Sequence, residues 1–106
     1  SNKSKNKLLK ISLKKIKKYG AVSEQICLEM LKSISKISKS NISISITGIA
    51  GPNGGTKEKP VGLVYVGIKR GNKTIIKKYL FKNQSRSYIQ KNTVNKCLRL
   101  ILSLLK

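Results

Sequence analysis

Ile42-Ser-Ile-Ser-Ile-Thr47 is the stretch that decides the fold of this chain. It alternates strictly between isoleucine and a small hydroxyl residue, which is the period of a β-strand. One face of the strand would carry isoleucine, and the other would carry Ser43, Ser45 and Thr47. Because a helix can approach a face of small side chains closely, the polar face of this strand need not be exposed to solvent.

Two further strands are expected beyond it, Val61–Arg70 and Lys73–Phe81. Gly71-Asn72 lies between them and fits the tight turn of a β-hairpin. Pro60 precedes the first of these strands, where its missing N–H costs little. The sequence therefore predicts about three strands, two of them joined as a hairpin.

Helical patterns flank these strands. Residues 3–19 are dense in lysine, and Ser12 is a candidate cap for a short second helix that ends near Tyr19-Gly20. A helix packed on the core is favoured here over a basic helix on a membrane surface, because the apolar face is narrow. Ser23 is the expected cap of the next helix, which continues to about Lys39. Its core positions are Ile26, Met30, Ile34 and Ile37.

The last helix is expected from about Ser85 to Leu105, with Asn83 or Ser85 as its cap. Its positions at helical spacing are Ile89, Thr93, Cys97, Leu98, Ile101 and Leu105. The predicted class is α/β, a three-layer α/β/α arrangement with a mixed sheet that is incomplete in these 106 residues. We expect about three strands and three to four helices, and a missing N-terminal piece that gives the Ile42–Thr47 strand a parallel neighbour.

The chain is strongly basic, with 24 Lys and Arg residues against 3 acidic residues and a net charge of +21. Such a balance usually indicates a polyanionic partner. The lysines are spread over every segment, however, and only Arg70, Arg86 and Arg99 are arginine. Compositional drift is therefore favoured over selection for nucleic-acid binding, which stays open as the alternative function. No apolar stretch approaches the length of about 20 residues that spans a membrane.

The two cysteines, Cys27 and Cys97, lie far apart in the sequence, and histidine is absent. Zinc sites with Cys/His spacing are therefore excluded. Both cysteines fall among apolar residues in helical patterns. We interpret them as small core residues in a reducing compartment, and we expect a cytoplasmic protein.

The segment from Thr47 to Gly67 is rich in glycine and hydroxyl residues. Such a loop brings backbone N–H groups close to a polar ligand. Gly51, Gly54 and Gly55 match neither the dinucleotide-binding fingerprint nor the phosphate-binding loop that ends in Gly-Lys-Ser/Thr. From spacing alone, a mobile surface loop without a ligand is the slightly favoured interpretation.

The exact residues carry a resemblance. Thr47-Gly-Ile-Ala-Gly-Pro52 and Gly54-Gly-Thr-Lys-Glu-Lys-Pro-Val-Gly62 closely resemble the signature of the CinA C-terminal family, whose members are nicotinamide mononucleotide (NMN) deamidases. Tyr19-Gly-Ala-Val-Ser-Glu24 is similar to another string of that family. Further similarity lies in Ser1-Asn2, Lys5, Leu8-Leu9, Phe81, Arg86 and Ile89. The resemblance implies that residues 1–106 are the later two thirds of a single domain.

The implied reaction is hydrolysis of the nicotinamide carboxamide of NMN to nicotinic acid mononucleotide and ammonia, with neither metal nor cofactor. The resemblance implies a serine nucleophile in an Ala-Glu-Ser-Cys-Thr-Gly-Gly motif and a nearby tyrosine, and neither is in this sequence. We therefore expect the chain to have no activity alone. A decaying remnant without function is a further alternative, against which the intact signature argues.

The resemblance assigns catalytic roles by position to Lys5, Thr47 and Arg86. A lysine beside a serine assists formation of the alkoxide, and an arginine near a helix start binds phosphate or a carboxamide oxygen. Glu58 is expected to pair with a lysine and fix the loop. The expected substrate-binding residues are Gly48, Gly51, Asn53, Gly54 and Gly55. The expected partners are the nucleotide substrate and a second copy of the chain, with nucleic acid through non-specific charge and no membrane.

Overall fold

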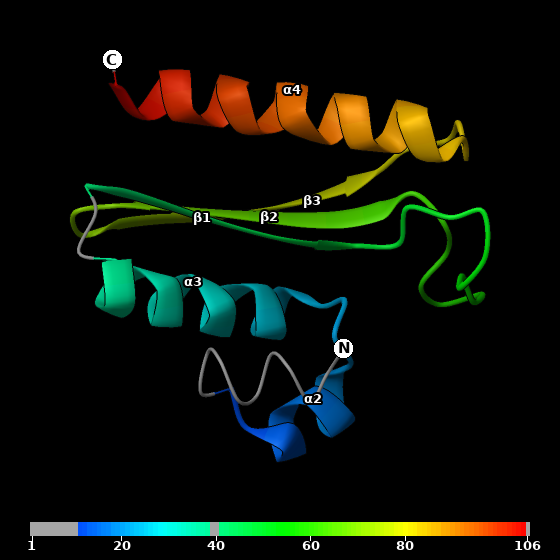
Figure 1. Cartoon of the computed structure of the whole chain (residues 1–106), viewed down its shortest axis with the longest axis horizontal. Helices are drawn as coiled ribbons and strands as arrows, with labels where there is room; N and C mark the ends of the chain where they lie inside the picture. Colours follow the sequence, from blue (N-terminus) through cyan, green and yellow to red (C-terminus); the bar gives the residue numbers. More distant parts are fainter. Residues whose placement is uncertain (1–10, 39–40, 106) are drawn as a thin grey trace.

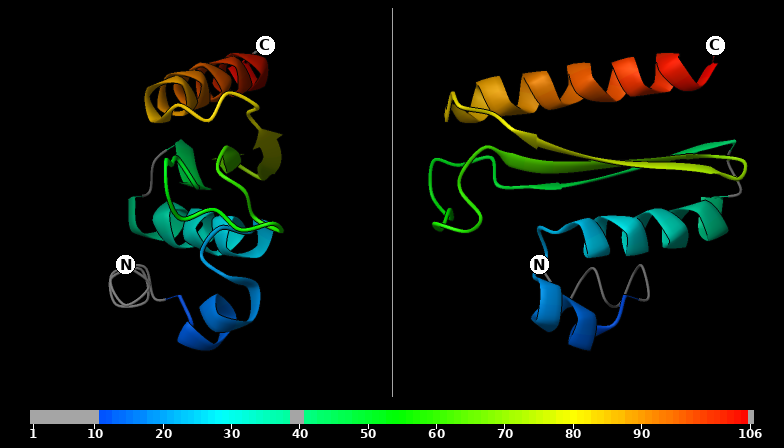
Figure 2. Two further views of the ribbon diagram at one scale, coloured as in Figure 1. Left: turned by 90° about the vertical axis from the view of Figure 1, so that its right-hand side faces the viewer. Right: turned by 180° about the vertical axis from the view of Figure 1, so that it is seen from behind.

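The structure, a computed structural model, describes residues 11–38 and 41–105. These residues form three layers, with α4 on one face of a sheet and α3 on the other, and with α2 packed below α3 (Figures 1 and 2). The elements are α2 (Leu13–Tyr19), α3 (Glu24–Ser38), β1 (Ile42–Gly48), β2 (Leu63–Arg70), β3 (Lys73–Leu80) and α4 (Arg86–Leu105). The predicted α/β class and its three layers are confirmed.

The three strands lie in the order β1-β2-β3, and both pairs are antiparallel. Arg70 pairs with Lys73 across the predicted two-residue turn, where Gly71 has a φ of 58°. A parallel neighbour of β1, which a mixed sheet would contain, is not among the described strands. Strands β1 and β2 are antiparallel because residues 49–62 fold back on themselves, with the Ile49 N–H donating to the Leu63 carbonyl and the Gly62 N–H to the Ile49 carbonyl.

The serine face of β1 is the better buried one. Ser43, Ser45 and Thr47 lie against α3 at 4%, 3% and 4% exposure, while Ile46 on the opposite face is 44% exposed. Helix α3 approaches closely because Gly67 on β2 has no side chain. A Cβ atom there would lie 2.7 Å from Ser45 Oγ and 3.2 Å from Cys27 Sγ. A helix therefore does cover the small-residue face, which the alternating sequence had left open.

Two apolar clusters form the core. The larger one fills the space between the sheet and α4, and its buried members are Val61, Val64, Val66, Ile68, Ile89, Cys97 and Leu104. The smaller one joins α2 to α3 through Ile11, Ile16, Ile26 and Met30. Both cysteines are buried, as predicted.

Three residues predicted at core-facing positions are exposed. Ile37, at 63% exposure, lies in the last turn of α3, beyond the contact with α2. Leu98 and Leu105 are each 53% exposed, because α4 turns Cys97 and Leu104 toward the sheet instead. The apolar pattern of α4 therefore continues past the face that the described residues cover.

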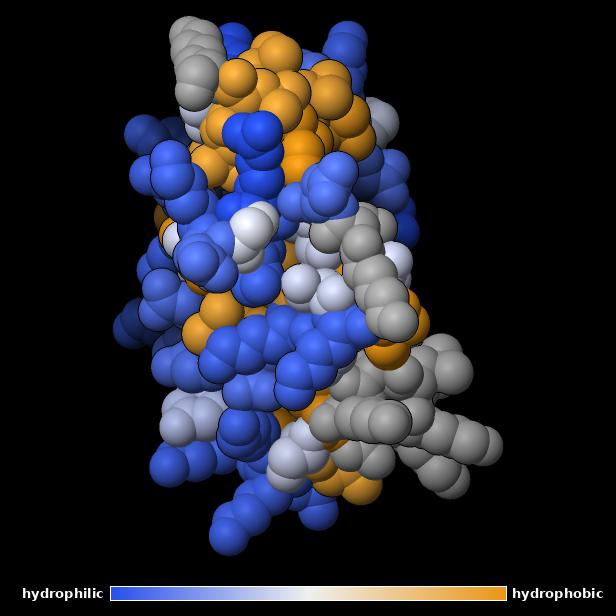
Figure 3. Space-filling model, turned by 90° about the vertical axis from the view of Figure 1, so that its left-hand side faces the viewer, coloured by the Kyte–Doolittle hydropathy of each residue, from blue (hydrophilic) through white to orange (hydrophobic). Residues whose placement is uncertain are grey.

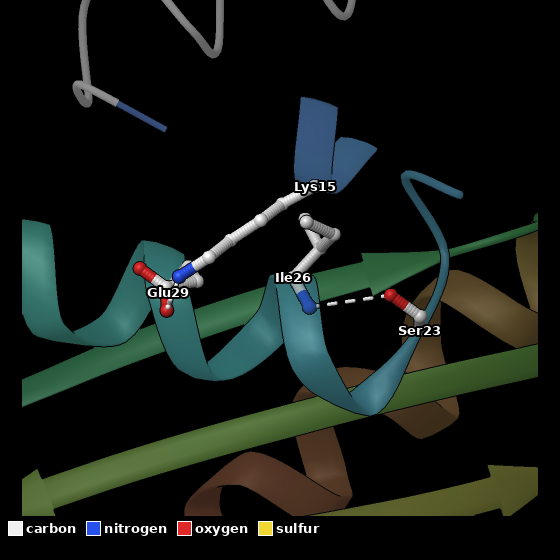
Figure 4. Close-up of polar contacts among 4 residues, drawn as sticks. All are labelled: Lys15, Ser23, Ile26 and Glu29. Atoms are coloured by element: carbon white, nitrogen blue, oxygen red, sulfur yellow. Dashed lines mark hydrogen bonds and ion pairs between the residues drawn. The ribbon is translucent and has the colours of Figure 1, made fainter. Parts of the chain in front are cut away.

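The start of α3 is fixed by the predicted cap. The Ile26 N–H donates to Ser23 Oγ at 3.2 Å (Figure 4), and Ser23 Oγ donates to the Gly20 carbonyl at 2.9 Å. An ion pair between Lys15 and Glu29, at 2.9 Å, links α2 to α3 in the same view. The connection between α2 and α3 is thus fixed by the hydrogen bonds of Ser23, and the two helices are joined by the ion pair.

The other two predicted caps differ. Helix α2 begins directly after Ser12, but the Ser12 hydroxyl makes no capping hydrogen bond. At α4, the Ile89 N–H donates to the Ser85 carbonyl at 3.0 Å, and the Tyr88 N–H approaches Ser85 Oγ at 3.5 Å. Asn83 Oδ1 accepts from the Ser85 N–H, so both predicted residues take part in this helix start.

Candidate functional site

The glycine-rich loop, residues 49–62, lies at one end of the sheet, where β1 ends and β2 begins (Figure 1). Its base is closed by the two backbone hydrogen bonds between Ile49 and residues 62 and 63. Its tip contains a tight turn in which the Thr56 N–H donates to the Lys59 carbonyl at 2.9 Å and the Lys59 N–H donates to Thr56 Oγ1 at 3.0 Å. The loop is therefore an ordered structure with its own hydrogen bonds.

A hollow of about 380 Å³ lies on this loop. Gly55 is required there, because a Cβ atom would lie 2.7 Å from the Val61 backbone nitrogen, and Gly54 has a φ of 96°. Three predicted substrate-binding residues, Asn53, Gly54 and Gly55, line the hollow together. The other lining residues are Pro52, Thr56, Pro60, Val61 and Gln84. The sequence analysis did not identify Gln84, which no motif distinguishes.

Arg86, the first residue of α4, reaches the loop from the other side. Its Nη1 donates to the Gly51 carbonyl at 3.0 Å. Gly51 has a φ of 77°, and a Cβ there would lie 2.5 Å from Val61 Cγ1. Two residues that were predicted separately, Arg86 and Gly51, are thus in direct contact. The exposed guanidinium carries five N–H donors in all. The positive end of the α4 dipole lies at the same place.

Thr47 lies at the root of the loop but faces α3. Its Oγ1 donates to the Ala21 carbonyl at 2.7 Å, in the connection between α2 and α3. The hydroxyl proton is therefore used within the protein, whereas the oxygen still has lone pairs that can accept a hydrogen bond. The catalytic role of Thr47 stays a prediction.

Lys59 makes a second link to the same connection. Its Nζ donates to the Tyr19 carbonyl at 2.5 Å. Gly20 is needed beside it, since a Cβ there would lie 2.6 Å from Lys59 Nζ and the Gly20 φ is 81°. The Tyr19–Glu24 string and the Thr47–Gly62 string therefore interlock through Thr47 and Lys59. Neither string by itself predicts this contact.

The lining of the hollow contains none of the other predicted site residues: Thr47, Gly51 and Arg86 lie elsewhere on or beside the loop. Lys5 lies outside the described residues. Gly48 lines an apolar groove on the α4 side of β1, and a Cβ there would lie 2.9 Å from Val64 Cγ2. The predicted ion pair of Glu58 with a lysine is not found within the described part of the chain. An ion pair there joins Lys15 to Glu29 instead. Lys59 holds the loop through a backbone carbonyl instead.

The resolved pKa shifts lie away from the hollow. Burial raises the pKa of the Cys97 thiol, and the nearby Cys27 raises it further. Burial also raises the pKa of Tyr79, with a smaller contribution from Cys97. Among residues 11–38 and 41–105, no group of three His, Cys, Asp or Glu side chains is placed to hold a metal ion. No helix in these ranges is long and apolar enough to cross a membrane.

Comparison with known proteins identifies the family of this chain. The CinA C-terminal domain family matches residues 1–105. This chain belongs to that family. A CinA-like protein of Prochlorococcus marinus (strain MIT 9312) is 50% identical over 107 residues, which is 96% of this chain and 25% of that protein. The chain thus spans about a quarter of this curated relative.

Solved structures of the CinA superfamily share the fold. The competence/damage inducible protein CihA from Agrobacterium tumefaciens superposes with a TM-score of 0.94 at 33% identity, covering 100% of this chain and 65% of that one. A CinA superfamily protein from Enterobacter cloacae gives a TM-score of 0.91 at 31% identity, covering 100% of this chain and 62% of that one. The sequence-based recognition of the family is confirmed.

Proposed function

We propose that this CinA-family domain forms part of an amidohydrolase site that converts NMN to nicotinic acid mononucleotide and ammonia. The observation that supports this best is the interlock at one end of the sheet. There the loop meets Arg86 through Gly51 and meets the α2–α3 connection through Thr47 and Lys59. Two sequence strings of the family thus serve one local structure, as expected for a binding site.

The loop and its surroundings have features that suit an anionic nucleotide. Arg86 and the start of α4 supply positive potential at Gly51, and the glycines at positions 54 and 55, which line the hollow, allow a ligand to approach the backbone. On this proposal Arg86 binds the phosphate or the carboxamide oxygen. Thr47 accepts a hydrogen bond through its oxygen, because its proton is donated to Ala21. Lys59 acts as a positioning residue that holds the loop.

The proposed site needs a nucleophile from elsewhere, since the serine motif is not in these 106 residues. The decisive measurement is ammonia release from NMN by this chain and by a form extended at its N-terminus with the unmatched part of the Agrobacterium tumefaciens protein. We expect turnover by the extended form alone. Clear turnover by the 106-residue chain would mean that the nucleophile lies within it.

Residue roles are tested in the extended form. Arg86→Gln should lower kcat/KM by roughly 10²-fold or more, which is the usual cost of removing one positioned donor. Lys91→Gln, on the exposed surface of the same helix, is the matched control and should change kcat/KM less than twofold. Equal effects of the two substitutions would remove Arg86 from the proposed site.

The net charge of +21 favours a second candidate, non-specific binding of nucleic acid. Against it, Arg70 and Arg86 both donate to backbone carbonyls, those of Leu104 and Gly51. The test is binding of duplex DNA at several salt concentrations. Affinity that falls steeply with salt would support this candidate, and affinity that does not change with salt would exclude it.

A further inference from the structure

Asn53-Gly54, within the glycine-rich loop, is a pair of residues with a chemistry of its own. When glycine follows asparagine, the glycine nitrogen can attack the side-chain carbonyl carbon of the asparagine, because no Cβ atom crowds it. Asn53 is the single asparagine of the 106 residues that precedes a glycine. Every other asparagine precedes Lys, Ile, Gln or Thr, whose side chains hinder the attack. The sequence therefore sets Asn53 apart from the other asparagines.

The structure leaves this pair of residues open to the reaction. Both are exposed, and within residues 11–38 and 41–105 neither the Asn53 side chain nor the Gly54 N–H makes a hydrogen bond. Gly54 has a φ of 96°, and a Cβ atom built on it would have Ile49 Cγ2, at 4.0 Å, as its nearest neighbour. At the adjacent Gly55, by contrast, a Cβ would lie 2.7 Å from the Val61 nitrogen. The attacking nitrogen and the amide of Asn53 are thus free of partners and of crowding.

Asn72 gives a comparison inside the same molecule. It is also exposed and also lies in a turn, but Lys73 follows it. This turn between β2 and β3 lies at the end of the sheet opposite the glycine-rich loop (Figure 1). Figure 3 faces that end and shows a mostly hydrophilic surface around the sheet, with apolar side chains gathered where α4 ends. The two asparagines therefore share exposure to water and differ in the residue that follows.

The asparagines near and within α4 are held in place. Asn83 Oδ1 accepts from the Ser85 N–H at 3.0 Å, and Asn92 Nδ2 donates to the Tyr88 carbonyl at 2.9 Å. Asn92 and Asn95 lie inside the helix, where the N–H of the following residue already donates to a backbone carbonyl. The backbone of α4 therefore protects its asparagines, and no such element contains Asn53.

We propose that Asn53 is a site of spontaneous covalent modification, which removes its side-chain amide and adds a negative charge to the loop. The Gly54 nitrogen forms a bond to Asn53 Cγ, and the amide nitrogen takes the proton of Gly54 and leaves as ammonia. Water then adds to either carbonyl of the cyclic imide and breaks its bond to the Gly54 nitrogen. Opening at Cγ gives aspartate, and opening at the backbone carbonyl gives isoaspartate. The net change exchanges –NH2 for –OH, with water consumed and ammonia released.

The modification falls on the hollow, whose lining contains Asn53, Gly54 and Gly55. Either product adds a carboxylate there, and isoaspartate also adds a carbon atom to the main chain. If the hollow binds an anionic nucleotide, the modified chain binds it more weakly, because like charges repel each other. This consequence rests on the proposed function, whereas the modification itself does not.

The test is incubation of the 106-residue chain in warm neutral buffer, followed by mass spectrometry of its peptides. We expect the peptide with Asn53 to gain the mass difference between –OH and –NH2 and to contain isoaspartate, which an isoaspartate methyltransferase labels. Asn72 should react roughly tenfold more slowly or less, because the residue after it has a Cβ atom. Gly54→Ala should slow the reaction of Asn53 by a similar factor. Because alanine is strained at a φ of 96°, Asn53→Gln is the second variant, and its longer side chain should leave the position unmodified.

Three results would overturn the proposal. They are equal conversion of Asn53 and Asn72, conversion of Asn53 without isoaspartate, and an unmodified Asn53 under conditions that convert a synthetic peptide of residues 50–57. The modification releases at most one ammonia molecule per chain and needs no NMN. Ammonia that appears without NMN therefore supports the modification, and ammonia beyond one molecule per chain supports the proposed reaction. In the extended form, Asn53→Asp should raise KM for NMN, and an unchanged KM would contradict only the role of the hollow in binding.

Discussion

On the α3 face of β1 the polar side chains of Ser43, Ser45 and Thr47 are almost fully buried, whereas on the α4 face of the same strand Ile46 is 44% exposed. The polar face is covered because serine and glycine let α3 approach, and because Ser45 Oγ donates to the Cys27 carbonyl at 2.8 Å. On the apolar face of β1, helix α4 covers only part of the isoleucine side chains, so Ile46 stays exposed. Close packing on this strand therefore follows the size of the side chains and not their polarity.

The largest expected effect comes from adding bulk to the α3 face. Gly67→Val would place its Cβ 2.7 Å from Ser45 Oγ and 2.9 Å from Ile76 Cδ1. Overpacking of this kind costs about 1–3 kcal/mol of unfolding free energy. Val94→Leu adds bulk to the open α4 face and should cost less than about 0.5 kcal/mol. Urea unfolding measures both, and equal costs would show that the two faces are equally packed.

A smaller loss of unfolding free energy is expected from a substitution of Thr47, where the loop begins. Thr47→Val keeps the shape of the side chain but leaves the half-buried Ala21 carbonyl without its donor. The loss should be about 1 kcal/mol of unfolding free energy. Thr74→Val, on the exposed strand β3, is the matched control and should be neutral. The same urea titrations test it, and a neutral Thr47→Val would mean that water replaces the hydroxyl.

Removing the hydrogen bond from Lys59 to the Tyr19 carbonyl should mainly affect the loop itself. Lys59→Met keeps much of the length of the side chain and removes the donor to the Tyr19 carbonyl. We expect faster hydrogen exchange at the Thr56 amide and a loss of about 1 kcal/mol or less, since the bond is only partly buried. Lys57→Met, at an exposed neighbouring position, should leave exchange unchanged. Identical exchange in the two variants would exclude Lys59 as the residue that holds the loop.

Cys97, in the core between α4 and the sheet, should make the free energy of unfolding depend on pH. Burial raises the pKa of Cys97 in the folded protein above that of the unfolded chain. Its contribution to stability is therefore complete below the unfolded thiol pKa of about 8.5 and is lost as pH rises through the folded value. Unfolding free energies at pH 7 and pH 10 should fall more for the original chain than for Cys97→Ala. Equal falls would contradict the shift.

The smallest effect is expected at the exposed apolar residues of α4. Leu102 is 60% exposed, so Leu102→Ser should change the unfolding free energy of this chain by less than about 0.5 kcal/mol. Leu104→Ser, at a buried neighbouring position of α4, is the contrast and should cost at least about 2 kcal/mol. A large loss of unfolding free energy with Leu102→Ser would contradict the exposure of this side chain.

Much of the local structure of the loop could be predicted from the sequence because its parts lie in one continuous string. The turn at Gly71, the cap at Ser23 and the glycines of the loop follow from local backbone requirements. The contacts of Lys59 with Tyr19 and of Thr47 with Ala21 span 40 and 26 residues. No local pattern contains a contact of that separation, so the interlock could not be predicted.

The sequence by itself determined the order of helices and strands, the α/β class and the CinA family, because periodicity, turn residues and a long specific string are local properties. Only the tertiary structure decided which side of each element is covered. It buried Ser45 and exposed Leu98, and it joined β1 to β2 antiparallel through the folded-back loop. The physical reason is that burial and strand direction depend on which distant segment packs alongside, and an alternating or helical pattern does not encode that partner.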